Sequence, residues 1–391
     1  MREVVLVGAT RTAIGKSPRG TLRHTRPDDL GAFVLCAVIE RVPGLAPEEV
    51  EDVILGCATP EAEQGFNVAR VAALRAGLPD SVPGMTLNRF CASGLEAIAV
   101  AAARIATGQA DIVIAGGTES MTMVPFMGPG TRPNPVLMER RPDTYLSMGL
   151  CVEGLAREYG ITRQEADAFA LQSHQKAVAA QDSGRFSGEI APITVKVQEG
   201  EGDAVTVREV LFARDEGPRR DTSLDALAQL QPAFCEGGII TAGNASQRSD
   251  GAAAVVLTTR EIARARGWEP LARFVDYAVT AVAPEQFGIA PAYAIPKVLH
   301  RASVPLQDVD LIEFNEAFAA QVLATHRIYP LPMERVNVNG GAVALGHPLG
   351  ATGARQTVTL VHEARRRGAR YGLVTMCAAL GMGAAGLFAF D

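Results

Sequence analysis

Short apolar segments that read as buried strands alternate with longer apolar segments that read as helices along most of this chain. Strands are expected at residues 4–8, 52–56 and 111–117. Helices are expected between them, at residues 30–39 and from about 93 to 107. Strands that are apolar on both faces need cover on both faces, as in parallel or mixed sheets. The alternation therefore predicts an α/β fold with helices on both sides of a sheet.

The second half of the chain repeats the pattern of the first. Cys91 precedes an alanine-rich helix and a strand that ends in two glycines, and His347 precedes a glycine-rich segment, a helix at 354–366 and a strand that ends on Cys377. A reactive side chain before a helix in both halves indicates an internal duplication. A chain of 391 residues is also too long for one ordinary core, so two domains or two fused halves are expected.

The segment from about residue 118 to 247 departs from this alternation. Proline and glycine are frequent near residues 125–142, and two amphipathic helices are expected at 152–159 and 163–181. We interpret the segment as an insertion that lies over the sheet. It concentrates arginine, most of which is expected to be solvated surface, although a few arginines are candidates for binding a phosphate-bearing ligand.

Composition and charge exclude several classes of protein. The net charge of −6 and the lack of a basic run argue against a nucleic-acid partner. The six cysteines are scattered and form no C-x-x-C pair, so neither a zinc site nor a secreted disulfide framework is expected. The apolar runs are too short to span a bilayer, and no signal peptide precedes the first strand, which predicts a cytoplasmic protein without a membrane partner. The spacing from Gly8 to Gly15 does not fit a dinucleotide-binding turn.

Cys91 stands where an extended run meets the alanine-rich helix that begins near Ser93. Gly94 allows the backbone to pack closely at that junction. A thiol there is near the positive end of the helix dipole, which favours the thiolate, the nucleophilic form. From this stretch alone a catalytic nucleophile and a buried structural cysteine both remain open.

Two other glycine-rich loops each carry one reactive side chain. His347 lies between Gly346 and Pro348, and Cys377 precedes the glycines at 381 and 383. A lone histidine is more often structural than catalytic. A loop built for close backbone approach favours the functional reading.

Six motifs in order resemble those of the thiolase family, the acetyl-CoA C-acyltransferases. The motifs are NRFCASGL at 88–95, GGTESM at 116–121, TAGNAS at 241–246, NEAFA at 315–319, GGAVALGHPLG at 340–350 and CAALGMG at 377–383. They span nearly all of the chain, so the resemblance implies the fold of that family. It implies a five-layered αβαβα body of two similar halves, each with a five-stranded sheet. The halves are expected at 1–267 and 268–391, with a loop domain at about 118–247 over a coenzyme A tunnel.

The resemblance also implies a mechanism. Cys91 attacks a thioester carbonyl and carries the acyl group, and His347 takes the thiol proton and points a donor at a thioester oxygen. Cys377 removes or returns the α-proton of the acetyl group. Asn315 holds a water in one oxyanion hole with His347, and backbone amides of Cys91 and of the loop after Cys377, at Ala379, form a second hole. Coenzyme A is a substrate, and no bound cofactor or metal is expected.

The resemblance also implies ligand-binding residues and an assembly, although less specifically than it implies the catalytic residues. Four residues match positions that line the pantetheine tunnel, namely Ser246, Phe234, Met148 and Phe318. Arg219 resembles an arginine near the adenine nucleotide. The family forms homodimers, some of which pair into homotetramers, and acyl-CoA and coenzyme A are the expected small-molecule partners.

The chain departs from the family pattern at Ala379, where glycine is usual. If that position needs positive φ, alanine is disfavoured there. Ser147 stands where acetoacetyl-specific members often carry histidine, and the loop before Met148 is compact. These features favour a 3-ketoacyl-CoA thiolase of broad chain length, with an acetoacetyl-CoA-specific biosynthetic thiolase as the alternative. More distant alternatives are a β-ketoacyl synthase, a cysteine hydrolase and a non-catalytic acyl-CoA-binding or lipid-binding relative, and the presence of Cys91, His347 and Cys377 together argues against them.

Overall fold

The strands build one mixed sheet and one separate hairpin. The computed structural model describes residues 2–126, 128, 130–200 and 206–390. Its strands are β1 Val4–Arg11, β2 Gly15–Lys16, β3 Asp52–Gly56, β4 Gly84–Leu87, β5 Ile112–Ser120, β6 Ile193–Glu199, β7 Thr206–Phe212, β8 Ser249–Thr259, β9 Ala272–Ala281, β10 Leu311–Phe314, β11 Tyr371–Ala378 and β12 Met382–Ala389. Ten of these described strands form one sheet in the order β10-β11-β12-β9-β1-β8-β5-β3-β4, with β2 paired to β8, while β6 and β7 pair separately.

The helices divide between the two faces of this sheet and the inserted segment. They are α1 Pro27–Glu40, α2 Val68–Arg75, α3 Ser93–Ala106, α4 Pro135–Arg140, α5 Met148–Glu158, α6 Arg163–Asp182, α7 Leu224–Ala228, α8 Arg260–Arg266, α9 Pro291–Ala302, α10 Ala319–Ile328, α11 Ala342–Leu345 and α12 Thr352–Arg367. Each helix and strand expected from the sequence outside the inserted segment is present, with ends that differ by a few residues.

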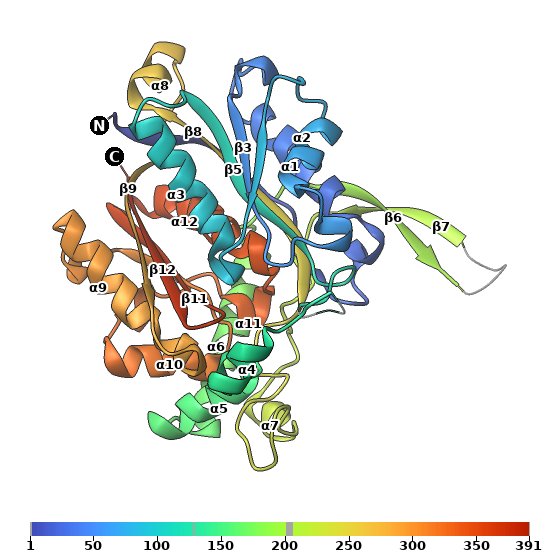
Figure 1. Cartoon of the computed structure of the whole chain (residues 1–391), viewed down its shortest axis with the longest axis vertical. Helices are drawn as coiled ribbons and strands as arrows, with labels where there is room; N and C mark the ends of the chain where they lie inside the picture. The colour runs from blue at the N-terminus through green and yellow to red at the C-terminus, as the bar shows by residue number, and fades with distance from the viewer. Residues whose placement is uncertain (1, 127, 129, 201–205, 391) are drawn as a thin grey trace.

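Alternate residues of the strands separate three hydrophobic layers. In β1, Val5 faces a core shared with α1 and α2, whereas Leu6 faces a core shared with α3 and α12. In the same way, Leu373 of β11 packs with α9 and Val374 packs with α12. The helices α3 and α12 therefore lie between the two groups of strands, which Figure 1 shows. Because α1 and α2 cover one outer face and α9 and α10 the other, the predicted five-layered αβαβα arrangement is confirmed.

Two short pairings join the two groups of strands into one sheet. Val5 pairs with Arg273 and Leu6 with Ala272, where β1 meets β9. The group that contains β1 has the five expected strands, β1, β3, β4, β5 and β8. In the other group, the fifth strand is reduced within the described residues to a single pairing of Ile312 with Val336. Asn337 has a φ of 45°, which turns the chain out of the extended conformation at that point.

Glycines allow the central helices to approach very closely. A Cβ atom added to Gly94 would lie 2.7 Å from the amide nitrogen of Ala354, and one added to Gly353 would lie 2.4 Å from that of Leu95. The close approach expected at Gly94 is thus confirmed. It brings the N-terminal ends of α3 and α12 together, and these ends carry Cys91 and the loop of His347.

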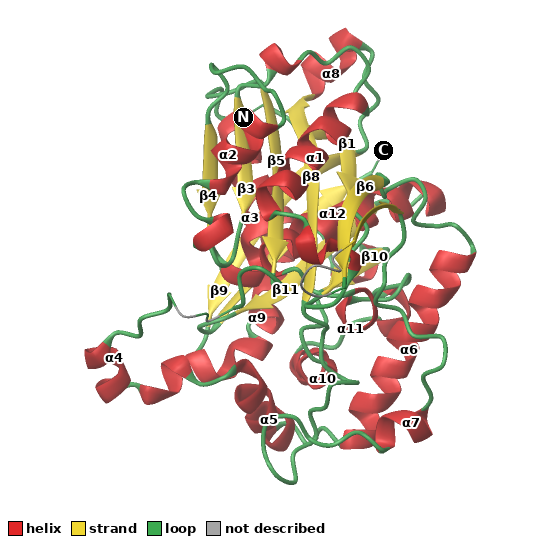
Figure 2. Ribbon diagram, turned by 90° about the vertical axis from the view of Figure 1, so that its right-hand side faces the viewer, coloured by secondary structure: helices red, strands yellow, loops and turns green. Residues whose placement is uncertain are grey.

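The segment between β5 and β8 lies beside the sheet and packs on the core shared with α1 and α2 through residues such as Ala177 and Ile193. It contains α4, α5, α6 and α7 and the β6–β7 hairpin, and Figure 2 shows these helices gathered below the strands. The two amphipathic helices expected here are α5 and α6, of which α5 begins four residues earlier than expected, at Met148. Ser147 caps α5, since its hydroxyl oxygen accepts a hydrogen bond from the amide of Leu150. No helix in the described parts of the chain is long and apolar enough to cross a membrane.

Candidate active site

Cys91 lies in a strained turn that leads into α3. The single 3-10 turn Phe90–Ala92 precedes the helix, and Phe90 has a φ of 47°. The Asn88 side chain accepts a hydrogen bond from the Phe90 amide at 2.7 Å, and the Ser93 hydroxyl accepts one from the Arg89 amide at 2.8 Å. These two side chains fix the turn that presents the thiol. Strain of this kind is common where a side chain is held for function.

The charge state expected for Cys91 is wrong. Only 2% of the residue is exposed, and burial raises the pKa of its thiol to about 12. Hydrogen bonds from the backbone amides of Cys91 and Ala379 lower the pKa by less than burial raises it. Desolvation thus outweighs the helix terminus, so the resting group is a thiol that needs a base.

His347 is held as a neutral imidazole beside Asn315. The Asn315 Nδ2 atom lies 3.2 Å from His347 Nε2, and the Thr352 Oγ1 atom lies 2.6 Å from His347 Nδ1. The Thr352 hydroxyl donates its proton to the Pro348 carbonyl at 2.9 Å, so it accepts the Nδ1 proton of the ring. Burial, followed by the positive charge of Arg355, lowers the pKa of His347 to about 3. The Nε2 atom is therefore free of its own proton, which is the form that a general base requires.

Cys377 is the second-last residue of β11 and lies near Cys91. Burial raises the pKa of its thiol well above the ordinary value, and a neighbouring negative charge on Cys91 would raise it further. The next loop bends at Leu380 and Gly381, which have φ values of 63° and 83°. Ala379 does not have positive φ, so the concern over alanine at this position is resolved: its amide reaches the Cys91 thiol in ordinary backbone geometry.

An apolar cavity opens at Phe90 and Ala379, which are near Cys91 and Cys377 in the sequence, although neither cysteine lines it. One side of it is formed by Ala379 and Leu380 of the loop after Cys377, and by Phe90. The inserted segment and the 3-10 segment Pro284–Ile289 form most of the rest of the wall. The remaining lining residues are Ala58, Thr59, Phe126, Thr131, Thr144, Tyr145, Leu146, Met148, Cys151, Pro284 and Phe287. Two of the predicted ligand residues, Met148 and Ala379, therefore line this cavity.

A second, more polar cavity contains Arg219. His174, Asp221, Thr222, Gly243, Gln247 and Val343 are among the residues that line it. The amide of Arg219 donates a hydrogen bond to His174 Nδ1 at 3.1 Å. Burial, followed by the positive charge of Arg219, lowers the pKa of His174 to about 4, so this ring is neutral and Arg219 supplies positive charge to the cavity.

The remaining predicted ligand residues lie together but line neither cavity. The rings of Phe234 and Phe318 meet edge to face with centroids 6.0 Å apart. The backbone amide of Ser246 donates to the carbonyl of Ala317 at 3.0 Å, next to Phe318. Met148 packs on the cluster of buried side chains that holds both Phe318 and Cys377, so this group lies beside Cys377.

Comparison with known proteins identifies the family. The family described as "Thiolase, N-terminal domain" matches residues 4–261, and "Thiolase, C-terminal domain" matches residues 268–389. The chain belongs to the thiolase family. It is 50% identical to a 3-ketoacyl-CoA thiolase of Bacillus subtilis, over 99% of each chain. Among solved structures, the Bacillus anthracis acetyl-CoA acetyltransferase has a TM-score of 0.90 at 42% identity, and human mitochondrial 3-ketoacyl-CoA thiolase has a TM-score of 0.90 at 38% identity; each covers 100% of this chain and 99% of the other.

Three supporting residues of this thiolase had no role assigned from the sequence. The buried Glu119 carboxylate accepts hydrogen bonds from the amides of Ala58 and Gly350, each at 2.7 Å, and from the Gln64 side chain at 2.6 Å. It therefore joins the wall of the apolar cavity to the loop of His347. Two of these residues could have been found from the sequence. Glu119 is a carboxylate near the end of a buried strand, and Thr352 has a hydroxyl five residues after His347. Cys151 gave no signal, because it sits within an amphipathic helix.

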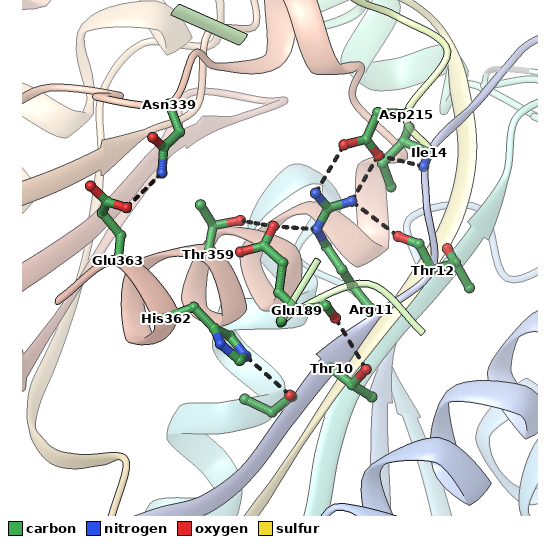
Figure 3. Close-up of polar contacts among 12 residues, drawn as sticks. Thr10, Arg11, Thr12, Ile14, Glu189, Asp215, Asn339, Thr359, His362 and Glu363 are labelled. Carbon is green, nitrogen blue, oxygen red and sulfur yellow. Dashed lines mark hydrogen bonds and ion pairs between the residues drawn. The ribbon is translucent and has the colours of Figure 1, made fainter. Parts of the chain in front are cut away.

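A buried arginine fixes the inserted segment of this thiolase to the sheet. Arg11 of β1 bonds Glu189 at 2.7 Å and Asp215 at 2.7 and 2.9 Å, and both carboxylates come from the inserted segment. Figure 3 shows this network, in which Thr359 of α12 also donates to Glu189. Burial alone would lower the pKa of Arg11, but the two carboxylates raise it, so the guanidinium stays charged. Removing one member would leave a buried charge unpaired, which makes this contact hard to open.

Proposed function

We propose that this thiolase cleaves 3-ketoacyl-CoA with coenzyme A to give acetyl-CoA and a shortened acyl-CoA, in a reversible reaction through an acyl group on Cys91. One observation carries the proposal. The Ala379 amide bonds the Cys91 thiol, Cys377 lies close enough to Cys91 for a charge there to raise its pKa, and an apolar cavity opens at Ala379. A nucleophile, a second proton carrier and room for an alkyl chain are the parts that this reaction needs. The test is thiolysis itself, followed as loss of the magnesium-enolate absorbance of acetoacetyl-CoA after coenzyme A is added.

In the first half of the reaction, the Cys91 sulfur attacks the keto carbon of the substrate while His347 Nε2 takes the thiol proton. The bond between C2 and C3 then breaks, the acyl group stays on Cys91, and the electron pair remains on C2 of the departing acetyl-CoA. Cys377 donates its proton to that carbon and becomes a thiolate. Its raised pKa suits this step, because a less acidic thiol is closer in pKa to the carbon acid with which it exchanges a proton.

In the second half, coenzyme A enters with its thiol near Cys377. The Cys377 thiolate takes the thiol proton, and the coenzyme sulfur attacks the acyl carbon on Cys91. His347 returns its proton to the departing Cys91 sulfur, so all three residues end as they began. The protonated Nε2 atom and Asn315 stabilise one oxyanion, and the amides of Cys91 and Ala379 stabilise the other. Losing one such donor usually costs about 2.7–4 kcal/mol of barrier.

The apolar cavity supports the longer-chain reading over the acetoacetyl-CoA-specific alternative. Its wall of Phe90, Phe126, Leu146, Met148 and Phe287 offers apolar contact to an alkyl chain well beyond acetoacetyl. The ratio of kcat/KM for 3-ketooctanoyl-CoA to that for acetoacetyl-CoA measures the preference. A ratio above one supports the broad 3-ketoacyl-CoA reading, whereas failure to cleave the longer substrate supports the alternative.

Filling the cavity should shorten the preferred chain. Cys151 is buried on α5 and lines the cavity, so Cys151→Phe should lower kcat/KM for 3-ketooctanoyl-CoA by roughly 10-fold or more, the usual cost of a steric mismatch in a pocket. Cleavage of acetoacetyl-CoA should change little. Leu150→Phe is the matched control, because Leu150 is next to Cys151 but is 38% exposed and does not line the cavity. Equal losses for short and long substrates in Cys151→Phe would contradict the assignment of the cavity.

Arg219 is proposed to hold the phosphate-bearing end of coenzyme A in the polar cavity. Arg219→Ala should raise KM for coenzyme A by about 5- to 10-fold, as for a lost charge-assisted hydrogen bond, and should leave KM for pantetheine unchanged. Initial rates with the two acceptors measure this difference. Equal effects on both acceptors would show that Arg219 is plain surface.

The proposal extends to the assembly and the location of the protein. We assign residues 1–267 and 268–391 as the two thiolase halves, with the inserted segment in the first, and a homodimer or homotetramer as the assembly. The Bacillus subtilis relative, which matches over 99% of each chain, supports a cytoplasmic location. A non-catalytic relative is disfavoured because all three reactive residues, Cys91, His347 and Cys377, are present. A non-catalytic protein would bind acetoacetyl-CoA without loss of the enolate signal.

A further inference from the structure

The residues from Asp215 to Arg219, here called the strap, cross from the buried arginine to the polar cavity. At one end, Asp215 is bound by Arg11 and by the Ile14 amide at 2.8 Å, as Figure 3 shows. At the other end, the amide of Arg219 bonds His174. In the middle, a Cβ atom added to Gly217 would lie 2.1 Å from the Ala344 carbonyl oxygen, so the strap is pressed against α11. The helix α11 leads directly into Gly346 and His347.

Gln247 ties the strap to the loop of His347. Its Nε2 atom donates to the carbonyl of Gly217 at 3.1 Å, to that of Val343 at 3.0 Å and to that of Ala344 at 3.1 Å. Its own backbone carbonyl accepts the amide proton of His347 at 3.0 Å. One residue thus contacts the strap, the short helix before the base and the base itself, and it also lines the polar cavity.

We propose that Gln247 is a positioning residue that couples the coenzyme-binding strap to the catalytic base His347. The inference rests on the proposed function. The side-chain amide fixes Gly217, and hence Arg219 two residues further on, in the place where a nucleotide phosphate can reach it. The same amide and the Gln247 carbonyl fix the two ends of the segment from Val343 to His347. Coenzyme binding and the orientation of the base therefore both depend on Gln247, the first through its side chain and the second through its side chain and its backbone carbonyl.

Three carbonyl oxygens lose their donor when the amide is removed. Methionine has nearly the same length and volume as glutamine but no donor, so Gln247→Met removes the bonds without opening a cavity. The strap and the loop of His347 should then loosen independently. KM for coenzyme A should rise by about 5- to 10-fold, and kcat should fall by about 10-fold, magnitudes typical of one lost buried hydrogen bond at each place.

Truncated substrates separate the two effects. With acetoacetyl-pantetheine and pantetheine, which lack the nucleotide, Gln247→Met should keep its loss of kcat but lose its effect on KM. Arg219→Ala should show the reverse pattern, an effect on KM for coenzyme A alone. Gln247→Asn, which keeps the amide on a shorter side chain, should show both effects in smaller measure and provides the test if the methionine variant does not fold.

Gln321→Met is the structural control. Gln321 is also buried and lines neither cavity, and its side chain donates to the carbonyl of Gly288 at 3.1 Å. This variant should lose stability without any change in KM or kcat in the folded enzyme. The inference is overturned if the Gln247 variants behave like Gln321→Met, or if they change only one of the two constants. Absence of thiolysis in the unmodified protein would instead overturn the proposed function. In that case, binding of coenzyme A measured by calorimetry still tests the inference, because Gln247→Met should weaken it by about 5- to 10-fold.

Discussion

Thiolysis of acetoacetyl-CoA should fall by on the order of 10⁴–10⁶-fold when Cys91 is replaced by alanine, because loss of a covalent nucleophile removes the whole acyl-enzyme route. The substitution deletes one buried atom from a turn held by Asn88 and Ser93, so the fold should persist. Binding of coenzyme A should be nearly unchanged, since the polar cavity with Arg219 does not include Cys91.

Cys36→Ala is the control for loss of any cysteine. Cys36 is half-buried on α1, where its thiol contacts the carbonyl of Ala76. Its replacement should leave the rate of thiolysis within a factor of two of the unmodified enzyme. Residual activity of Cys91→Ala within tenfold of the unmodified enzyme would rule out Cys91 as the acyl carrier.

Replacing Cys377 with alanine should lower thiolysis and condensation by roughly 10²–10⁴-fold, the usual contribution of a positioned acid or base. Cys91 and His347 suffice to load an acetyl group, because that step moves no proton on carbon. Cleavage of the carbon–carbon bond also requires a proton on C2, which we propose that Cys377 supplies. Cys377→Ala should therefore still form acetyl-Cys91 from acetyl-CoA.

Proton exchange isolates the step assigned to Cys377. In deuterated water the unmodified enzyme should exchange the methyl protons of acetyl-CoA, and Cys377→Ala should not, which an NMR time series measures directly. Cys235→Ala, at a half-buried cysteine of the inserted segment, should exchange like the unmodified enzyme. Exchange at the unmodified rate in Cys377→Ala would assign the α-proton to another group.

The layer arrangement could be predicted because hydrophobic patterns decide it locally. The strand 52–56 was placed without error, since five buried residues in succession fit only a strand covered on both faces. The helix α3 was placed within one residue, because its alanine-rich face packs on the sheet regardless of partners further away. The missing length of the fifth C-terminal strand could not be predicted, because it depends on the unusual φ of Asn337.

The roles of the site residues could be predicted only where the motif resemblance carried them, and their electrostatics could not. The position of Cys91 before a helix is a local property, but its burial beneath the loop after Cys377 is a tertiary one, and burial reverses the expected charge state. Ala379 raised a concern that only backbone geometry resolves, since positive φ falls on Leu380 instead. Gln247 contacts Gly217, which is 30 residues away in the sequence, and Ala344, which is 97 residues away, so no local sequence pattern predicts these contacts.

The central claim is that Cys91 carries the acyl group, and trapping that group tests it most directly. The enzyme is incubated with acetyl-CoA, quenched in acid and digested, and the mass of each cysteine-containing peptide is measured. An acetyl group on the peptide that contains Cys91, in both the unmodified enzyme and Cys377→Ala, is the predicted result. An acetyl group on a peptide with Cys57, Cys151 or Cys377 and none on that with Cys91 would contradict the account.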